Sequence, residues 1–207
     1  MSGYTHLDIL DLYRSGRFPM ADSREAEHFV IVEPELRGII PLGGLHISRS
    51  LAKFMRGADY RVTVDTAFND VVAACSLPRP TEGGGTWISD ALRELYYIFF
   101  LEKHAHSVEV WQNNTLIGGL FGVTIGGAFF GESMFSAQPN ASKLALVHLV
   151  ERLKVGGFTL LDTQYKTDHL ESMGGIEILQ EDYLKLLAPA LNIEADFAAF
   201  DRVEKTA

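Results

Sequence analysis

The stretch from Gly118 to Gln164 constrains the fold of this chain more than any other part of it. Apolar residues interrupted by glycines fill its first part, a helical pattern follows over residues 140–154, and an apolar strand ends it. Hairpins followed by a helix and a further strand predict an α+β sheet with helices packed on its faces. Glu132, Asp162 and Gln164 lie next to these strands. Polar groups at the mouth of an apolar sheet are typical of a site that holds an apolar group and reacts at its polar end.

The rest of the chain predicts a regular series of short elements. Periodic apolar residues and capping residues predict helices over 6–15, 49–56, 66–75, 89–103, 166–173 and 181–187. Apolar runs predict strands at 29–33, 36–41, 60–64, 107–111, 116–123, 128–131, 158–162 and 176–179. Asn113–Asn114 predicts a hairpin turn, residues 18–20 an extended turn, and the Pro- and Gly-rich residues 78–85 a loop or linker.

The composition is that of a folded protein with a sizeable core. Of 207 residues, 47% are hydrophobic and 22% are charged, which suits one large domain or two small ones. No apolar run reaches the roughly 20 residues that span a membrane, and the N-terminus does not resemble a signal peptide. Cys75 is the only cysteine and is expected to be a buried thiol, which fits a reducing, cytoplasmic location.

Glu132, Asp162 and Gln164 each have a structural and a chemical interpretation. Alternation along a strand places Asp162 and Gln164 on one side, with Thr163 opposite. A carboxylate beside an amide oxygen can orient and deprotonate an amine, or the same residues can simply cap a turn. Glu132 follows apolar residues at an expected strand end, where it can hold a cation or face solvent. The residue types alone leave both interpretations open.

A set of leucines accompanies these polar residues. Leu146, Leu149 and Leu153 recur at helical spacing, and Leu161 ends the apolar run of the following strand. They can line a pocket for a leucine-sized group, although core packing is the commoner meaning of such a stripe. Trp87 follows a run of three glycines and can stack on a base or an aromatic ring, or anchor the core.

A basic cluster contrasts with the acidic balance of the chain. The formal net charge of −9 argues against a general nucleic-acid binder, because affinity for phosphates depends on Lys and Arg. His46, Arg49, Lys53 and Arg56 nevertheless follow one another at helical spacing, so we expect them to share one side of a short helix. That side is either a solvated face or a contact for phosphates.

Two cofactor classes lack support in the sequence. His104–Ala105–His106 offers two histidines but no placed third ligand, so no metal is expected. The link SMFSAQPNAS at 133–142 contains no glycine. An acetyltransferase of the GNAT type holds the pyrophosphate of its cofactor on a glycine-rich turn at this place. We therefore expect neither coenzyme A nor any other cofactor.

Nine blocks of sequence, found in order between residues 14 and 187, carry a resemblance to a known family. They are GRFPMAD, LHISRSL, TWI, AHSVEVW, IGGLFGV, FFGESMFS, NASKLAL, GFTLLDTQ and DHLESMGG. Together they resemble the leucyl/phenylalanyl-tRNA–protein transferase family, and an ordered set of this length is far more specific than any single short motif.

The resemblance implies an enzyme that moves Leu or Phe, and weakly Met, from aminoacyl-tRNA to the N-terminal amine of proteins beginning with Arg or Lys, which marks them for N-end-rule degradation. It implies a GNAT-like C-terminal domain over 63–207 behind a small mixed α/β N-terminal domain over 1–62. By position it assigns a polar site of Glu132, Asp162 and Gln164, an amino-acid pocket of Leu120, Gly131, Leu146, Leu149, Leu153 and Leu161, a contact from Trp87 to the tRNA 3′ adenosine, and a tRNA-binding face of His46, Arg49, Lys53 and Arg56.

The expected mechanism needs positioning and removal of a proton, because the ester of an aminoacyl-tRNA is already activated. Gln164 is expected to accept a hydrogen bond from the acceptor amine, Asp162 to orient Gln164, and Glu132 to attract the cationic end of the acceptor. Backbone N–H groups near Gly131 are expected to stabilise the oxyanion. Water, Asp162 or the tRNA ribose takes the proton, and the sequence does not choose among them.

The chain departs from the family pattern at Ile31 and Val32, where tryptophan is usual, and at Phe99–Phe100 and Lys103. These changes bear on stacking of the adenosine and on the choice of acceptor. Three alternatives remain open: a non-catalytic tRNA-binding paralogue, a tRNA-dependent ligase acting on a cell-wall precursor, and a GNAT acetyltransferase. We expect a monomer whose partners are aminoacyl-tRNA and proteins with a basic N-terminal residue.

Overall fold

The structure, a computed structural model, describes residues 4–57, 59–78 and 86–204, so the predicted loop at 78–85 lies almost entirely outside the described part. Its helices are α1 (His6–Arg14), α2 (Arg49–Gly57), α3 (Phe68–Cys75), α4 (Asp90–Leu101), α5 (Ala141–Val155), α6 (Asp168–Glu171), α7 (Gln180–Ala190) and α8 (Ala199–Glu204). Its strands are β1 (Phe18–Met20), β2 (Val30–Val32), β3 (Leu36–Ile39), β4 (Arg61–Val64), β5 (Ala105–Gln112), β6 (Thr115–Ile125), β7 (Ala128–Ser136), β8 (Leu160–Gln164) and β9 (Ile176–Leu179).

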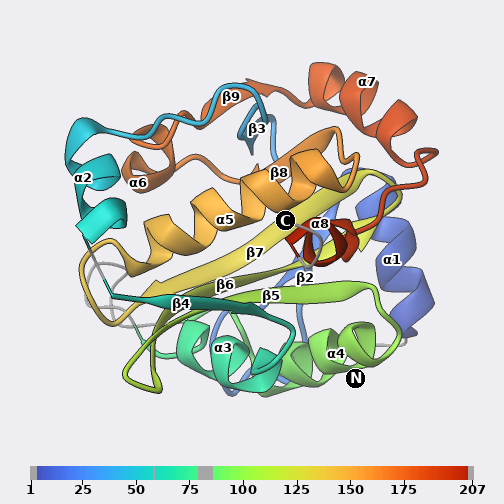
Figure 1. Ribbon diagram of the computed structural model, residues 1–207. Coiled ribbons are helices and arrows are strands. Elements are labelled where there is room, and N and C mark those ends of the chain that lie inside the picture. The colour runs from blue at the N-terminus through green and yellow to red at the C-terminus, as the bar shows by residue number, and fades with distance from the viewer. Residues whose placement is uncertain (1–3, 58, 79–85, 205–207) are drawn as a thin grey trace.

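A seven-stranded sheet in the order β4-β5-β6-β7-β8-β3-β9 forms the body of the molecule (Figure 1). Neighbouring strands of this sheet are antiparallel, except for β7 and β8. These two strands run parallel, because the helix α5 connects them. The β5–β6 hairpin turns at Asn113 and Asn114, whose φ angles of 49° and 62° suit the left-handed turn that a two-residue hairpin needs. The predicted turn at Asn113–Asn114 is confirmed, as is the predicted order of antiparallel hairpins, a helix and a further strand.

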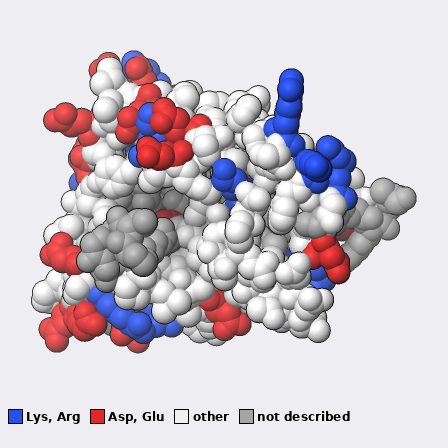
Figure 2. Space-filling model, turned by 90° about the vertical axis from the view of Figure 1, so that its left-hand side faces the viewer, with Lys and Arg blue, Asp and Glu red and all other residues white. Residues whose placement is uncertain are grey.

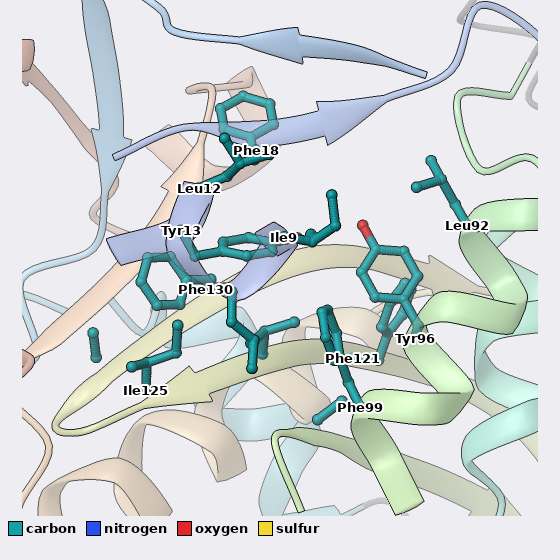
Figure 3. Close-up of a cluster of buried hydrophobic side chains, with 14 of the residues drawn as sticks. Ile9, Leu12, Tyr13, Phe18, Leu92, Tyr96, Phe99, Phe121, Ile125 and Phe130 are labelled. Atoms are coloured by element: carbon teal, nitrogen blue, oxygen red, sulfur yellow. The ribbon is translucent and has the colours of Figure 1, made fainter. Parts of the chain in front are cut away.

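Helices cover both faces of this sheet (Figure 1). On one face α5 packs on β5, β6 and β7, and its leucines join an aliphatic core. On the other face α1, α3 and α4 enclose an aromatic core, in which Tyr13 and Tyr96 lie near Phe121 and Phe130 (Figure 3). None of the helices in the described ranges combines the length and hydropathy that a membrane span requires.

Three details differ from the sequence-based expectations. Residues 18–20 form strand β1 and pair with β2, because the antiparallel partner Val30–Val32 supplies hydrogen bonds that a turn would lack. Strand β7 continues to Ser136 instead of ending at Gly131. Strand β3, from the expected N-terminal domain, lies between β8 and β9, so the two proposed domains share one sheet.

Candidate active site

A cavity opens where strands β7 and β8 part. Their parallel pairing ends at Phe130 and Asp162, although β7 continues for six more residues to Ser136. Beyond that point a cavity of about 750 Å³ lies between the two strands and α5, with Trp87 and the end of α3 also on its wall. The split in the sheet is therefore the structural origin of the candidate site.

The apolar wall of the cavity comes largely from the leucines singled out in the sequence. Leu120, Leu146, Leu149 and Leu161 all line it, as do Trp87 and Gly131. Leu153 does not line it; one turn further along α5, it is fully buried in the aliphatic core. The prediction for Leu153 is wrong, because the stripe of α5 runs past the cavity into the packed part of the sheet.

Glu132 lies in a β-bulge and not at a strand end. In the β6–β7 ladder, Gly122 pairs with Gly131 and Phe121 with Ser133, so Glu132 is the extra residue between them. A bulge leaves its extra residue unpaired and re-aims the side chain. Of the two interpretations left open by the sequence, the solvated strand end is wrong, because Glu132 is only 7% exposed.

Three neutral donors hold the carboxylate of Glu132. Tyr13 donates to Oε1 at 2.7 Å, Tyr96 donates to Oε2 at 2.7 Å, and the amide of Gln164 donates to Oε1 at 3.1 Å. Burial raises the pKa of Glu132 to about 7, although the three hydrogen bonds act to lower it. Glu132 therefore changes its charge near neutral pH.

Gln164 occupies a strained turn at the end of β8. Its φ is 61°, which is uncommon for a residue with a side chain, and the N–H of Tyr165 donates to the carbonyl of Thr163 at 2.7 Å. This bond closes a three-residue γ-turn around Gln164, in the rarer and strained form. The turn presses against Gly38, where an added Cβ would lie 2.6 Å from the carbonyl carbon of Tyr165. The side-chain amide carried by this turn lies 3.1 Å from Oε1 of Glu132.

Asp162 does not line the cavity, and its contact with Gln164 agrees with the expectation that it orients this residue. Arg37 donates to both carboxylate oxygens, from Nε to Oδ1 at 2.9 Å and from Nη2 to Oδ2 at 2.6 Å. Tyr183 donates to Oδ2 at 2.8 Å, and the backbone N–H of Gln164 donates to Oδ1 at 2.8 Å. Asp162 thus contacts the backbone of Gln164 and sets the turn, not the amide itself.

Arg37 is the residue that sequence reasoning missed. It is completely buried, its guanidinium lies between the rings of Phe18 and Tyr183, and its Nη1 donates to the carbonyl of Gly16. Burial acts to lower the pKa of Arg37, but the carboxylate of Asp162 raises it above its usual value. An arginine inside the apolar strand LRGII was the available signal, since a buried cation needs an acidic partner.

The predicted basic face is present on α2, with one exception. Arg49, Lys53 and Arg56 are exposed at helical spacing, whereas His46 precedes the helix and its N–H donates to the carbonyl of Met173. His46 is exposed but lies off the helix, so the prediction of one four-residue helix face is wrong for it. Figure 2 views the side on which α2 lies in Figure 1, and Lys and Arg gather at the upper right of this view, apart from the acidic groups on its left.

The comparison with known families decides the class of this protein. Residues 39–188 match the sequence model of the family described as leucyl/phenylalanyl-tRNA protein transferase. The chain belongs to the leucyl/phenylalanyl-tRNA protein transferase family. The predicted family and the predicted enzyme class, an aminoacyltransferase, are confirmed.

Relatives with the name leucyl/phenylalanyl-tRNA–protein transferase match nearly the whole chain. The relative from Caulobacter vibrioides is 48% identical over 194 residues, which covers 94% of this chain and 89% of the relative. That from Phenylobacterium zucineum is 49% identical over 201 residues, with 96% and 90% covered. That from Afipia carboxidovorans is 50% identical over 191 residues, with 92% and 84% covered.

Similarity to solved structures is weaker. The C-terminal domain of a protein assigned as a lysylphosphatidylglycerol synthetase in Agrobacterium fabrum has a TM-score of 0.40 and 12% identity, covering 81% of this chain and 58% of that one. The expectation of a GNAT-like transferase domain stays a prediction.

Proposed function

We propose that this transferase moves Leu or Phe, and weakly Met, from aminoacyl-tRNA to the N-terminal amine of proteins beginning with Arg or Lys, and so marks them for N-end-rule degradation. One observation carries the proposal: a leucine-lined cavity ends at a buried carboxylate and an amide that contact each other. An apolar amino-acid side chain fits the first part and an incoming amine fits the second.

The apolar part of the cavity supports the choice of donor amino acid. The apolar wall consists of hydrocarbon side chains from Leu120, Leu146, Leu149 and Leu161. Among the described lining residues, the titratable side chains are those of Glu132, His169 and Tyr165. An apolar pocket of this kind discriminates among amino-acid side chains by their size and shape. One methylene is worth only about 1–3 kcal/mol in such a pocket, so some transfer of Met is expected.

The polar part supports an amine as the second substrate. Arg37 and Asp162 neutralise each other, which leaves the ionised form of Glu132 as an uncompensated negative charge beside the cavity. A cation is stabilised next to such a charge. The acceptor brings an α-ammonium group and, when it begins with Arg or Lys, a second positive charge.

The reaction assigned to this site is attack of the acceptor nitrogen on the ester carbonyl. The Gln164 amide donates to Glu132 through its nitrogen, so its carbonyl oxygen is the atom that accepts a hydrogen bond from the amine. Asp162 and Arg37 are positioning residues, because they hold the turn that carries Gln164. The backbone N–H of Gly131 is the proposed donor to the oxyanion.

The remaining parts of the proposal concern tRNA and architecture. Arg49, Lys53 and Arg56 bind tRNA phosphates, with His46 beside them, and Trp87 on the cavity wall stacks on the 3′ adenosine. The enzyme acts as a cytoplasmic monomer without a cofactor. A GNAT-like domain over 63–207 provides most of the cavity wall, and the N-terminal domain over 1–62 contributes strand β3 to the same sheet.

A single assay tests the proposed function. Labelled Leu-tRNA, Phe-tRNA and Met-tRNA are each offered with peptides that begin with Arg, Lys, Asp or Glu. The expected result is transfer of Leu and Phe, less of Met, to the Arg and Lys peptides only. Transfer to Asp or Glu peptides would contradict the acceptor assignment, and tRNA binding without labelled peptide would favour a non-catalytic paralogue.

A further inference from the structure

Glu132 differs from the other buried charged groups near the cavity in its partners. Those partners come from three elements and are all uncharged: Tyr13 on α1, Tyr96 on α4 and Gln164 on β8. Oε1 accepts two of these hydrogen bonds and Oε2 accepts one, counting bonds among the described residues. A carboxylate oxygen has two lone pairs, so Oε2 has room for one further donor.

The groups that are hydrogen-bonded to Glu132 or to Gln164 are poor proton acceptors. Asp162 already accepts four hydrogen bonds, two of them from Arg37, and it lies off the cavity wall. The amide of Gln164 is too weak a base to keep a proton. Burial and the nearby Glu132 raise the pKa values of Tyr13 and Tyr96 well above 10, so both phenols stay protonated.

We infer that Glu132 is the general base, which takes a proton from the α-ammonium group of the acceptor through Oε2. The inference rests on the proposed function and names the proton acceptor that this function requires. The neutral amine then forms its bond to the ester carbonyl carbon. As the bond between that carbon and the ribose 3′ oxygen breaks, a second proton leaves the nitrogen and ends on the 3′ oxygen. Glu132 finally returns its proton to solvent, and the site is ready again.

The energetic cost of this proton transfer is small because burial raises the pKa of Glu132. An α-amine has a pKa of roughly 7.7–8.0, and the pKa of Glu132 is about 7, so the transfer is unfavourable by only about tenfold. An ordinary glutamate, with a pKa of about 4.3, would face a penalty above about a thousandfold. Arg37 and Asp162, the charged groups that also act on Glu132, oppose each other.

The first test measures kcat and KM against pH for the wild type and Glu132→Gln, with Leu-tRNA and an Arg peptide. We expect kcat of the variant to fall about 100-fold at pH 7, a typical contribution of a general base, and by less than about tenfold at pH 9. At pH 9 the acceptor amine is already neutral. A loss confined to KM, or a kcat loss that is equal at every pH, would overturn the inference in favour of simple attraction or of a structural role.

A second variant tests the same inference without removing the carboxylate. Tyr96→Phe keeps the aromatic ring but removes the donor to Oε2, which lowers the pKa of Glu132 in the wild type. On the acid side of the profile, kcat reaches half its maximum at a pH set by Glu132. This pH should therefore be several tenths of a unit higher in Tyr96→Phe than in the wild type. Tyr97→Phe, at the exposed neighbouring position, is the matched control and should leave this pH unchanged. An unshifted profile for Tyr96→Phe would overturn the inference even if Glu132→Gln failed to fold.

These outcomes remain distinct from failure of the proposed function. If the wild type transfers no amino acid from any aminoacyl-tRNA at any pH, the proposed function is wrong. If the wild type transfers Leu but both variants keep its pH profile, only the role of Glu132 as the base is wrong.

Discussion

Two buried carboxylates lie on neighbouring strands of this sheet, and their surroundings differ in one respect. Asp162 on β8 is bound by a buried guanidinium, whereas Glu132 on β7 is bound only by phenols and an amide. The ion pair fixes the position of the Asp162 carboxylate through two hydrogen bonds from Arg37, whereas burial among neutral donors raises the pKa of Glu132 to about 7. We therefore propose that Asp162 positions Gln164, whereas Glu132 takes part in the proton transfer.

The largest effect should come from breaking the ion pair. Asp162→Asn leaves the charge of Arg37 buried without a partner, which costs about 3–5 kcal/mol of unfolding free energy. Glu132→Gln leaves no cation unpaired and should cost much less at pH 7. Urea unfolding of both variants at pH 7 measures the difference. Equal losses would show that the two carboxylates do not differ in the way described.

The dependence of stability on pH should come next. The folded-state pKa of Glu132 is raised from 4.5 to about 7, so the folded state binds the extra proton between these values. Stability from this group is present below pH 4.5 and is lost as pH rises through about 7, by about 3 kcal/mol in total. The wild type should therefore lose stability relative to Glu132→Gln across this window in urea unfolding. A constant difference between the two would contradict the raised pKa.

The third effect concerns the amide between the two carboxylates. Gln164→Ala removes the proposed acceptor of the amine hydrogen bond and should lower kcat/KM for Leu transfer about 100-fold. The unfolding free energy should fall by about 1–3 kcal/mol, because one hydrogen bond to a buried, partly ionised carboxyl group is lost. Gln138→Ala is the same change at an exposed position and serves as the control. Unchanged turnover for Gln164→Ala would remove this residue from the mechanism.

Variants of two leucines of α5 distinguish a residue that lines the cavity from one that packs in the core. Leu149→Ala enlarges the cavity, and the ratio of Phe to Leu transfer should rise by about tenfold or more. Leu153→Ala, one turn further, lies off the cavity and should leave the ratio unchanged. Both variants should lose about 2–5 kcal/mol of stability, so competition assays are run at a temperature where both are folded. A similar shift in both ratios would mean that the cavity wall is misassigned.

The smallest effect should come from the surface. Reversing Arg49, Lys53 and Arg56 to Glu should weaken tRNA binding at low salt, with a difference that shrinks as salt increases. A control with the same change of charge reverses Arg14, Lys154 and Lys185 to Glu, which are exposed on α1, α5 and α7. Filter binding at several salt concentrations compares the two triple variants. Equal affinities would remove α2 from the tRNA contact.

Much of the fold follows from local signals in the sequence. The helices and strands of the second half follow from apolar periodicity, and the β5–β6 turn follows from Asn113–Asn114. The extension of β7 beyond Gly131 does not follow from local signals. It includes a bulge at Glu132, and a bulge is defined only by the pairing of β7 with β6. The place of β3 between β8 and β9 is equally non-local, since it depends on pairing between segments more than 120 residues apart.

The candidate site shows the same division between local and non-local information. Motif positions identified Glu132, Gln164 and most of the leucines on the cavity wall. They could not show that Arg37 would hold Asp162, nor that Gln164 would take a positive φ. Both features arise from contacts with β3, where Gly38 accepts the close approach of the turn. The sequence therefore predicted most of the residues of the candidate site, but not the contacts that orient them.

The hydrogen bond from Tyr13 to Glu132 joins residues 119 positions apart in the chain. The shell around Glu132 is consequently assembled from distant parts of the chain, because α1 supplies one phenol and α4 supplies the other. A variant in which α1 no longer packs on the sheet would expose this carboxyl group to solvent and remove one of its donors. The proton affinity of Glu132 therefore depends on the docking of a helix that does not line the cavity.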